Sequence, residues 1–205
     1  VGIITEGITT TPYAYEIIAG IQSVCDAQGC MLLISETDGS AKASLRAFND
    51  FRRHRVSAIL YATNYRKAIS LPFGVSDTPC VLINCFESNV DRFPTVLPND
   101  EQGAYLLTKA LIGQGHRHIG FLTLSNNISA TPLRNIGYQR AHVEEGLLVD
   151  KRYTQVGVID QTDGRLIGGE FDALEERIHE LLSLSPKPTS IMFGNDKMAM
   201  RAYML

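Results

Sequence analysis

Long apolar runs are absent from this 205-residue sequence, and no stretch approaches the roughly 18 to 20 consecutive apolar residues that a membrane-spanning helix needs. The chain does not open on a basic segment followed by a short apolar run, the pattern of a secretory signal, and its first five residues resemble a strand instead. The composition, 44% hydrophobic and 20% charged, is typical of a globular protein. We therefore expect a soluble cytoplasmic protein without membrane contact.

An excess of positive charge is also lacking. The sequence holds 19 lysines and arginines against 22 aspartates and glutamates, which gives a formal net charge of −3 at pH 7. Such a balance excludes a chain that holds nucleic acid through its overall charge, so any DNA contact must have another source.

Cysteines are few for this length. Two disulfides could form among Cys25, Cys30, Cys80 and Cys85, but all four lie inside apolar segments. Each pair is separated by four residues, wider than the usual zinc knuckle, and no second matching pair lies nearby. We expect a reduced protein with four small buried thiols.

The common catalytic and metal-binding signatures are missing as well. There is no G-x-S-x-G elbow, no phosphate-binding G-x-x-x-x-G-K-[ST] loop, no H-E-x-x-H and no G-x-G-x-x-G after a strand. His116 and His118 have no further ligand at metal-binding spacing, and residues 160–164 resemble a calcium loop without its glutamate. We predict no enzyme activity, no metal and no cofactor.

What the sequence does contain is an alternation of short strand-like runs and longer helical runs, which predicts an α/β fold with parallel sheets. The helix at 13–27 places Ile17, Ile18, Ile21 and Val24 at three- and four-residue spacing and stops at Gly29. The helix at 40–54 is expected to bury Leu45, Phe48 and Phe51. Strands are expected at 1–5, 30–35, 58–62 and 79–84.

The alternation of strands and helices begins again after Pro94 and Pro98. This predicts two domains, residues 1–98 and residues 99–205. In the second half, helices are expected at 102–114, 132–145, 166–184 and from 197 onward, and strands at 119–124, 154–159 and 190–193. The sequence stops inside the last helix without a cap or a closing strand, so we expect the second domain to be incomplete.

Polar residues follow the predicted strands. In open parallel sheets the carboxyl ends of the strands line the ligand crevice. The segments just beyond those ends are residues 9–13, 37–38, 63–65, 85–86, 125–127, 160–161 and 195–196. Hydroxyls, amides, carboxylates and aromatic rings suit a sugar or another polyol, although loops are polar in any case.

Several segments together resemble the effector-binding core of the lactose-repressor-like (LacI/GalR) transcription regulators. The run 115–121, Gly-His-Arg-His-Ile-Gly-Phe, is similar to a family signature. The run 55–60 resembles the family's R-V-D-G-I-I, residues 134–138 resemble R-x-x-G-[FY], and residues 188–199 resemble P-T-A-I…N-D-x-M-A. The opening 1–4 and Thr11-Pro12-Tyr13 are similar to the first strand and the loop that follows it.

This resemblance implies two Rossmann-like, periplasmic-binding-protein-like subdomains that close on a small effector, usually a sugar and in some members a purine. It also implies a homodimeric repressor that contacts DNA through a helix-turn-helix headpiece, which this chain lacks. The alternative is a periplasmic sugar-binding transport protein of the same fold, and an enzyme is the weakest hypothesis.

By the same resemblance, Arg134 grips the effector, Asn195 hydrogen-bonds it and Tyr13 stacks on it. Structural alternatives are a surface ion pair of Arg134 with Glu144 or Glu145, a helix N-cap at Asn195 and packing of Tyr13 against the helix start. The complete set of expected ligand-binding residues is Thr11, Tyr13, Thr63, Cys85, Arg134, Gln161, Asn195 and Asp196. The sequence departs from the family pattern at 84–86, where a polar pair is usual, and at 99–100, where Asn-Asp replaces Asp-Asn.

Overall fold

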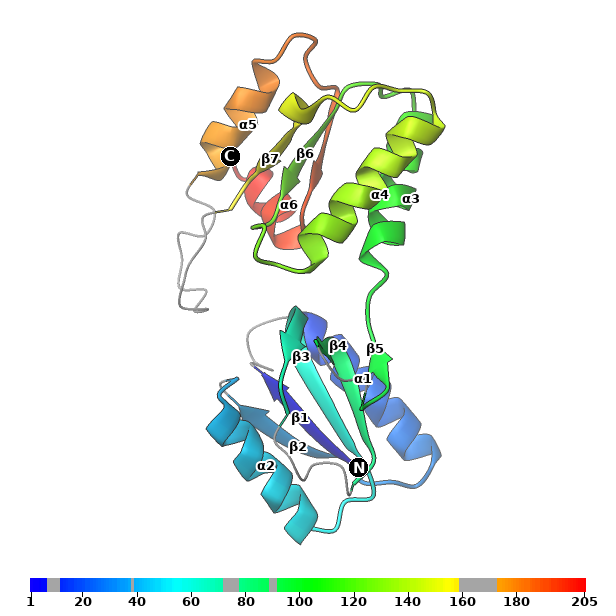
Figure 1. Cartoon of the computed structure of the whole chain (residues 1–205), viewed down its shortest axis with the longest axis vertical. Coiled ribbons are helices and arrows are strands. Elements are labelled where there is room, and N and C mark those ends of the chain that lie inside the picture. Colours follow the sequence, from blue (N-terminus) through cyan, green and yellow to red (C-terminus); the bar gives the residue numbers. More distant parts are fainter. Residues whose placement is uncertain (7–11, 38, 72–77, 89–91, 159–172) are drawn as a thin grey trace. The chain divides into compact units, whose positions relative to one another are not determined.

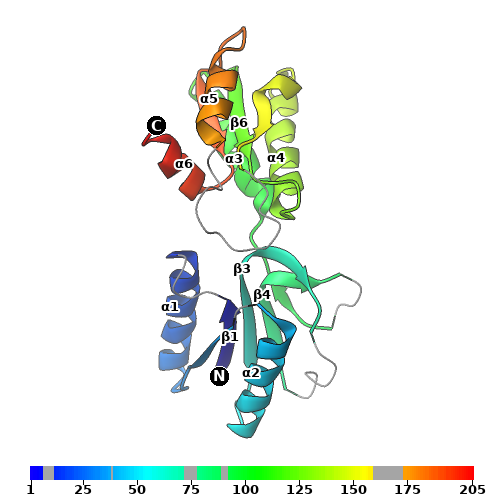
Figure 2. The same ribbon diagram turned by 90° about the vertical axis from the view of Figure 1, so that its left-hand side faces the viewer.

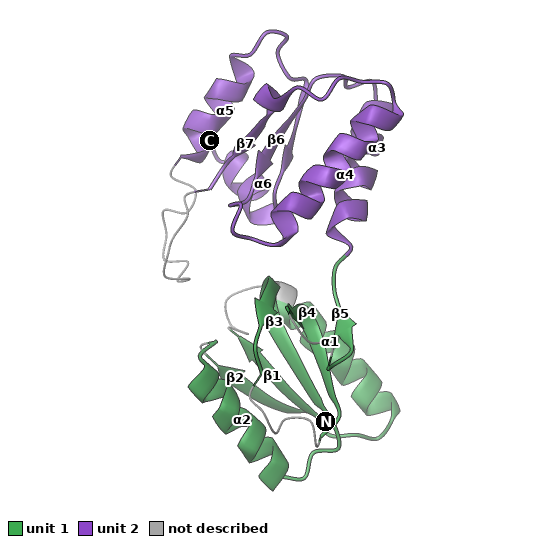
Figure 3. Cartoon of the chain, in the orientation of Figure 1, with its two compact units in different colours: residues 1–98 green, residues 99–205 purple. Residues whose placement is uncertain are grey.

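The computed structural model describes residues 1–6, 12–37, 39–71, 78–88, 92–158 and 173–205. The chain divides into two compact units, Val1–Pro98 and Asn99–Leu205 (Figure 3).

Unit 1 is a five-stranded parallel sheet with the strand order β2-β1-β3-β4-β5 (Figure 1). Its strands are β1 (Gly2–Glu6), β2 (Leu33–Thr37), β3 (Ile59–Ile69), β4 (Cys80–Glu87) and β5 (Thr95–Val96). The helices α1 (Pro12–Ala27) and α2 (Ala41–Arg53) cover opposite faces of the sheet (Figure 2). The predicted parallel α/β fold is confirmed.

The core of unit 1 forms between α2 and the sheet, where Phe48 and Phe51 pack against Ile4, Ile59 and Leu82. One core prediction is wrong, because Leu45 is 42% exposed. The buried face of α2 runs through Ser44, Ala47, Phe48 and Phe51. Leu45 lies about 100° round the axis from Ser44 and therefore points away from the sheet.

The four cysteines are free thiols, as expected, and Cys25, Cys80 and Cys85 are buried. Cys30 is exposed, which corrects the prediction that all four are buried. The reason is that β2 begins at Leu33 and not at residue 30, so Cys30 lies in the turn after Gly29. Gly29, which has a φ of 63°, ends the turn that follows α1.

Unit 2 contains a three-stranded parallel sheet with the order β7-β6-β8. The strands are β6 (Ile119–Thr123), β7 (Thr154–Val156) and β8 (Ser190–Phe193), and a short 3-10 helix, η2 (Lys151–Tyr153), precedes β7. The helices are α3 (Asp100–Gly113), α4 (Ala130–Glu144), α5 (Leu174–Leu182) and α6 (Asp196–Ala202). The strand predicted at 154–159 ends at Val156, and its last predicted residue lies outside the described residues, as does part of the helix predicted at 166–184.

Two buried clusters form in unit 2. One joins α3 and α4 to the sheet through Phe121 and Tyr138, whose rings lie 5.3 Å apart. The hydroxyl of Tyr138 donates to the carbonyl oxygen of Ile119 at 2.7 Å. The other cluster contains Leu122, Leu174, Leu181 and Met198. Among the described residues, we find no helix with both the length and the apolar character needed to cross a membrane.

Candidate functional site

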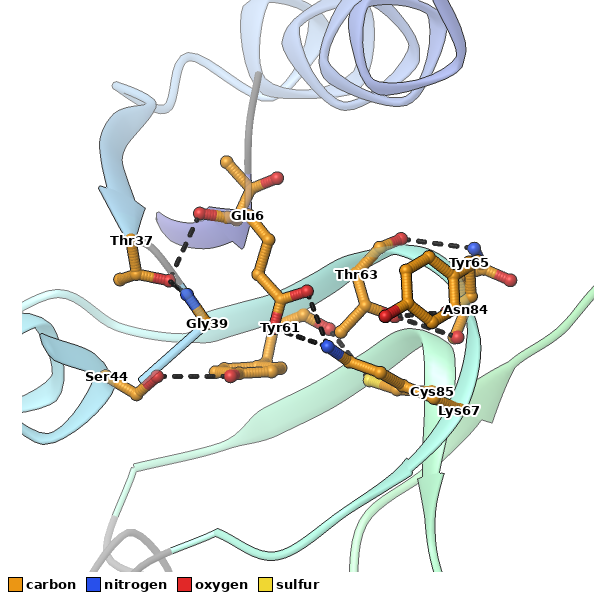
Figure 4. A network of polar contacts seen from close by, with 11 residues as sticks. Glu6, Thr37, Gly39, Ser44, Tyr61, Thr63, Tyr65, Lys67, Asn84 and Cys85 are labelled. Atoms are coloured by element: carbon orange, nitrogen blue, oxygen red, sulfur yellow. Dashed lines mark hydrogen bonds and ion pairs between the residues drawn. The ribbon is translucent and has the colours of Figure 1, made fainter. Parts of the chain in front are cut away.

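Polar side chains gather at the carboxyl edge of the unit 1 sheet (Figure 4). Glu6 ends β1, and its two carboxylate oxygens accept hydrogen bonds from the Lys67 ammonium at 2.7 and 3.0 Å. Beside them, the hydroxyls of Tyr61 and Ser44 share a hydrogen bond of 3.1 Å. These four side chains line a pocket of about 220 Å³, and the other lining residues are Gly39, Ala41 and residues 68–71.

An irregularity in β3 places Lys67 in this pocket. The register between β3 and β4 shifts between Ala62 and Lys67. At the shift, Thr63 donates to the carbonyl oxygen of Asn84 at 2.9 Å, and the Asn84 side chain donates to the carbonyl oxygen of Thr63 at 3.1 Å. Asn84 has φ of 59°, a conformation that asparagine adopts more readily than most residues. The bulged strand continues to Ile69, so residues 63–65 are not the loop that the sequence predicted.

The position of the Glu6 carboxylate requires a glycine at position 39. A Cβ atom at position 39 would lie 3.1 Å from Glu6 Oε1, and the φ of Gly39 is 79°. Burial lowers the pKa of Lys67, but the hydrogen bond and the charge of Glu6 outweigh it and raise the pKa above its usual 10.5. The pocket therefore contains a cation and a carboxylate that neutralise each other at neutral pH.

Thr63 and Cys85, two of the predicted ligand-binding residues, are buried beneath this edge. The hydroxyl oxygen of Thr63 also lies 3.0 Å from the carbonyl oxygen of Tyr65, so its single hydrogen is shared between the carbonyl oxygens of Asn84 and Tyr65. The thiol of Cys85 is completely buried and donates to the carbonyl oxygen of Tyr61 at 3.6 Å. Burial raises the pKa of Cys85 to about 11, so it is a neutral thiol at pH 7. Both polar groups thus have partners inside the sheet.

In unit 2, Arg134 is held by a carboxylate at the start of α3. Its Nε and Nη2 atoms donate to Asp100 Oδ1 at 2.9 and 2.7 Å, and its Nη1 atom donates to the carbonyl oxygen of Gly194. The side chain of Asp100 is 2% exposed and that of Arg134 is 29% exposed. Arg134 thus lies beside the segment that follows β8.

This arrangement corrects two expectations about Arg134. Its ion-pair partner is Asp100, whereas Glu145 pairs with Lys109 and Glu144 accepts from the hydroxyl of Tyr105. The helix α4 begins at Ala130 and not at the predicted residue 132, which places Arg134 in its second turn.

Asn195 and Asp196 follow β8 directly. Asn195 is the N-cap of α6, and its side-chain oxygen accepts a hydrogen bond of 2.8 Å from the backbone N–H of Met198, so the predicted cap is confirmed. Asp196 is exposed in the first turn of α6. The contact of Arg134 with Gly194 brings these three predicted residues to one edge of the unit 2 sheet.

The remaining predicted residues, Thr11, Gln161 and the side chain of Tyr13, lie outside the described part of the chain. Sequence reasoning missed Glu6, Ser44, Tyr61, Lys67 and Asp100. Glu6 alone carried a signal, because a carboxylate directly follows the predicted first strand. Within the described residues, no group of three or more histidine, cysteine, aspartate or glutamate side chains could hold a metal ion.

Comparison with known proteins places this geometry in a family. The model of the periplasmic binding proteins and sugar binding domain of LacI family matches residues 1–205. The ribose operon repressor of Haemophilus influenzae is 29% identical over 95% of this chain and 55% of its own length. The catabolite control protein A of Priestia megaterium is 28% identical over 98% of this chain and 57% of its own length.

Among solved structures, a LacI-family transcriptional regulator from Rhizobium etli is similar, with a TM-score of 0.86 and 33% identity. That match covers 99% of this chain and 70% of the other. The chain thus spans a little over half the length of the two curated relatives. Because the family model matches all 205 residues, this chain belongs to the family of periplasmic binding proteins and sugar-binding domains of LacI-type regulators.

Proposed function

We propose that this chain is the effector-binding part of a transcription regulator, and that its effector is an uncharged polyhydroxylated molecule such as a monosaccharide. The observation that carries the proposal is the matched pair of charges at the carboxyl edge of each sheet. Glu6 accompanies Lys67 in unit 1, and Asp100 accompanies Arg134 in unit 2.

A matched pair favours a neutral ligand for an electrostatic reason. Each cation is already compensated by a carboxylate, so a phosphate group brought to either edge would meet a negative charge together with the positive one. A ligand hydroxyl can accept from the cation of either pair, and in unit 1 a hydroxyl can also donate to the partly exposed carboxylate of Glu6. Within the described part of the chain, the contacts of Arg134 use three of its five N–H groups and leave two for a ligand.

The names of similar proteins support a regulator over a transport protein, because one curated relative is named a repressor and the Rhizobium etli structure is named a transcriptional regulator. By the same likeness, we propose that the whole protein acts in the cytoplasm and binds DNA through a headpiece outside this chain. The name of the ribose operon repressor makes pentoses the first sugars to test.

We also propose that the whole protein is a homodimer. Unit 1 exposes large apolar side chains on α1 and β2, with Tyr15 66%, Val24 64% and Ile34 48% exposed. Such side chains are candidates for an interface between two copies. Light scattering of the whole protein at micromolar concentration should give the mass of a dimer, and a monomer mass would contradict this proposal.

The effector class is tested by thermal unfolding of the chain with a panel of pentoses, hexoses, ribose 5-phosphate and purine bases. A sugar present at 100 times its dissociation constant should add about 2.7 kcal/mol to the free energy of unfolding. We expect stabilisation by a neutral sugar and none by its phosphate ester. Stabilisation by a purine base or only by the phosphate ester would overturn the assignment.

A further inference from the structure

Helix α2 and the turn after it expose a dense group of positive charges. The segment 42–55 carries five basic side chains and one acidic side chain, Asp50, which gives it a net charge of +4 in a chain of net charge −3. The five basic residues, all exposed, are Lys42, Arg46, Arg52, Arg53 and Arg55. We call them the basic face of α2. The carboxylate of Asp50 lies 3.4 Å from the guanidinium of Arg53, and both side chains of this ion pair are more than 60% exposed.

Arg55 occupies a backbone position that usually belongs to glycine. The N–H of Val56 donates to the carbonyl oxygen of Phe51 at 3.1 Å, and the N–H of Arg55 donates to that of Arg52 at 3.0 Å. These two bonds define a Schellman motif, whose C′ residue adopts a left-handed conformation. Arg55 has φ of 52°, so a large cationic side chain stands where glycine would be less strained.

Three of the five cations, Arg52, Arg53 and Arg55, lie toward the edge of unit 1 opposite to the Glu6 pocket, whereas Lys42 directly follows Ala41, which lines that pocket. The N–H of Gly2 donates to the carbonyl oxygen of Ala58, three residues after Arg55, at 2.9 Å. Figures 1 and 2 both show the end of α2 and the start of β1 at the same end of the unit. The three arginines at the end of α2 therefore lie toward the amino edge of the sheet, away from the proposed effector site at the carboxyl edge.

We propose that the basic face of α2 contacts the phosphate backbone of double-stranded DNA. The proposal rests on the proposed function, a regulator that acts at DNA. A helix of 13 residues is about 20 Å long, and each DNA strand carries one phosphate for about every 3.4 Å of the duplex axis. A row of cations of this length fits a repeating polyanion, and guanidinium groups pair with phosphate through two hydrogen bonds.

This contact adds affinity without adding sequence preference, because phosphates are the same at every base pair. The negative charge of the rest of the chain keeps the interaction weak at physiological salt. Binding should therefore appear at low ionic strength and fall steeply with added salt, as counterions released from DNA make the association less favourable.

The test uses the 205-residue chain and a fluorescein-labelled 30-base-pair duplex of arbitrary sequence, with anisotropy measured from 25 to 200 mM NaCl. The wild-type chain should bind at low salt. The variant R52A/R53A/R55G should bind at least tenfold more weakly at 50 mM NaCl, and its salt slope should fall by about one for each phosphate that the variant no longer binds. The matched control R152A/R177A/R201A removes the same charge from unit 2 and should retain most of the affinity.

The single variant R55G separates charge from folding, because glycine suits the left-handed position and the fold should be kept. We expect weaker DNA binding with an unchanged or higher melting temperature. Equal binding by the wild type and the triple variant would overturn the proposal, and so would an equal loss in the unit 2 control. Thermal shifts with the sugar panel on the same samples test the effector site separately, so that failure of either proposal is distinguishable from failure of the other.

Discussion

Arg134 shows how one side chain can serve the fold and a ligand together. Its contacts with Asp100 and Gly194 fix the direction of the guanidinium at the carboxyl edge of the unit 2 sheet. Because Asp100 is almost completely buried, removing the arginine also leaves a buried carboxylate without its cation. Both stability and ligand affinity should therefore respond to substitution at this position.

We predict that Arg134→Ala weakens binding of the true effector by roughly 1.5 to 3 kcal/mol, or about 10- to 150-fold, the range for hydrogen bonds that involve a charged group. Calorimetry measures the dissociation constant, and urea unfolding of the same variant measures the loss of stability. Arg134→Lys keeps the charge and helps to retain the fold, and Arg177→Ala, on the surface of α5, is the control. An unchanged dissociation constant for Arg134→Ala would leave this arginine with a structural role only.

A second residue, His142, makes stability depend on pH. His142 is 2% exposed, and its Nδ1 atom donates to the carbonyl oxygen of Tyr138 at 2.9 Å. Burial lowers its pKa below 6.5, and the hydrogen bond to Tyr138 opposes this shift only in part. The unfolded chain therefore binds a proton at a higher pH than the folded chain does.

It follows that the free energy of unfolding should decrease as the pH falls through 6.5 toward the lower pKa of the folded state. Urea unfolding between pH 7.5 and 5 measures this slope, and His142→Gln should flatten it. Equal slopes for the wild type and His142→Gln would contradict the assignment.

At the scale of elements, the packing of α3 against α4 depends on Gly137. A Cβ atom at position 137 would lie 2.1 Å from the carbonyl oxygen of Glu101 and 2.8 Å from the backbone nitrogen of Tyr105. Both atoms belong to the backbone of α3, so they cannot move aside as a flexible side chain would. The glycine therefore sets the distance between the two helices.

We predict that Gly137→Ala lowers the free energy of unfolding by at least the 1 to 3 kcal/mol typical of overpacking. The matched control is Gly103→Ala in α3, where a Cβ atom would meet no atom within 4 Å. That substitution should raise stability by up to about 1 kcal/mol, because alanine has the higher helix propensity. Chemical denaturation measures the free energy of unfolding of both variants, which should decrease for Gly137→Ala and increase for Gly103→Ala. Equal changes in the two variants would show that the helices have room to separate.

At the scale of the whole molecule, the hydrophobic clusters follow the division into two units. The cluster around Phe48 contains only residues of unit 1, and the clusters around Tyr138 and Leu181 contain only residues of unit 2. Each unit therefore has the core that independent folding requires.

We predict that Phe48→Ala, which removes a buried ring, costs about 3 to 5 kcal/mol and destabilises unit 1 selectively. Hydrogen exchange should accelerate at the amides of β1 and β3 and stay unchanged at those of β6 and β8. Equal acceleration in both units would show that they unfold as one cooperative body.

The sequence alone determined the class of fold, because alternating strand and helix patterns depend on local periodicity. It also predicted the cap at Asn195, since an N-cap is satisfied within one turn of its own helix. The strand at Ser190–Phe193 was predicted with its observed bounds for the same reason. Local rules, however, placed Leu45 in the core, although a helix buries only the face that its neighbours cover.

Only the tertiary structure decided the sites, because their partners are distant in sequence. Lys67 reaches Glu6 across 61 residues through the bulge that Thr63 and Asn84 hold in place. Arg134 pairs with Asp100 and not with Glu144 or Glu145, because the approach of α4 to α3 at Gly137 brings the start of α3 within reach. Periodicity specifies which face of an element is apolar, whereas the pairing of two charges depends on where the packed backbone brings them together.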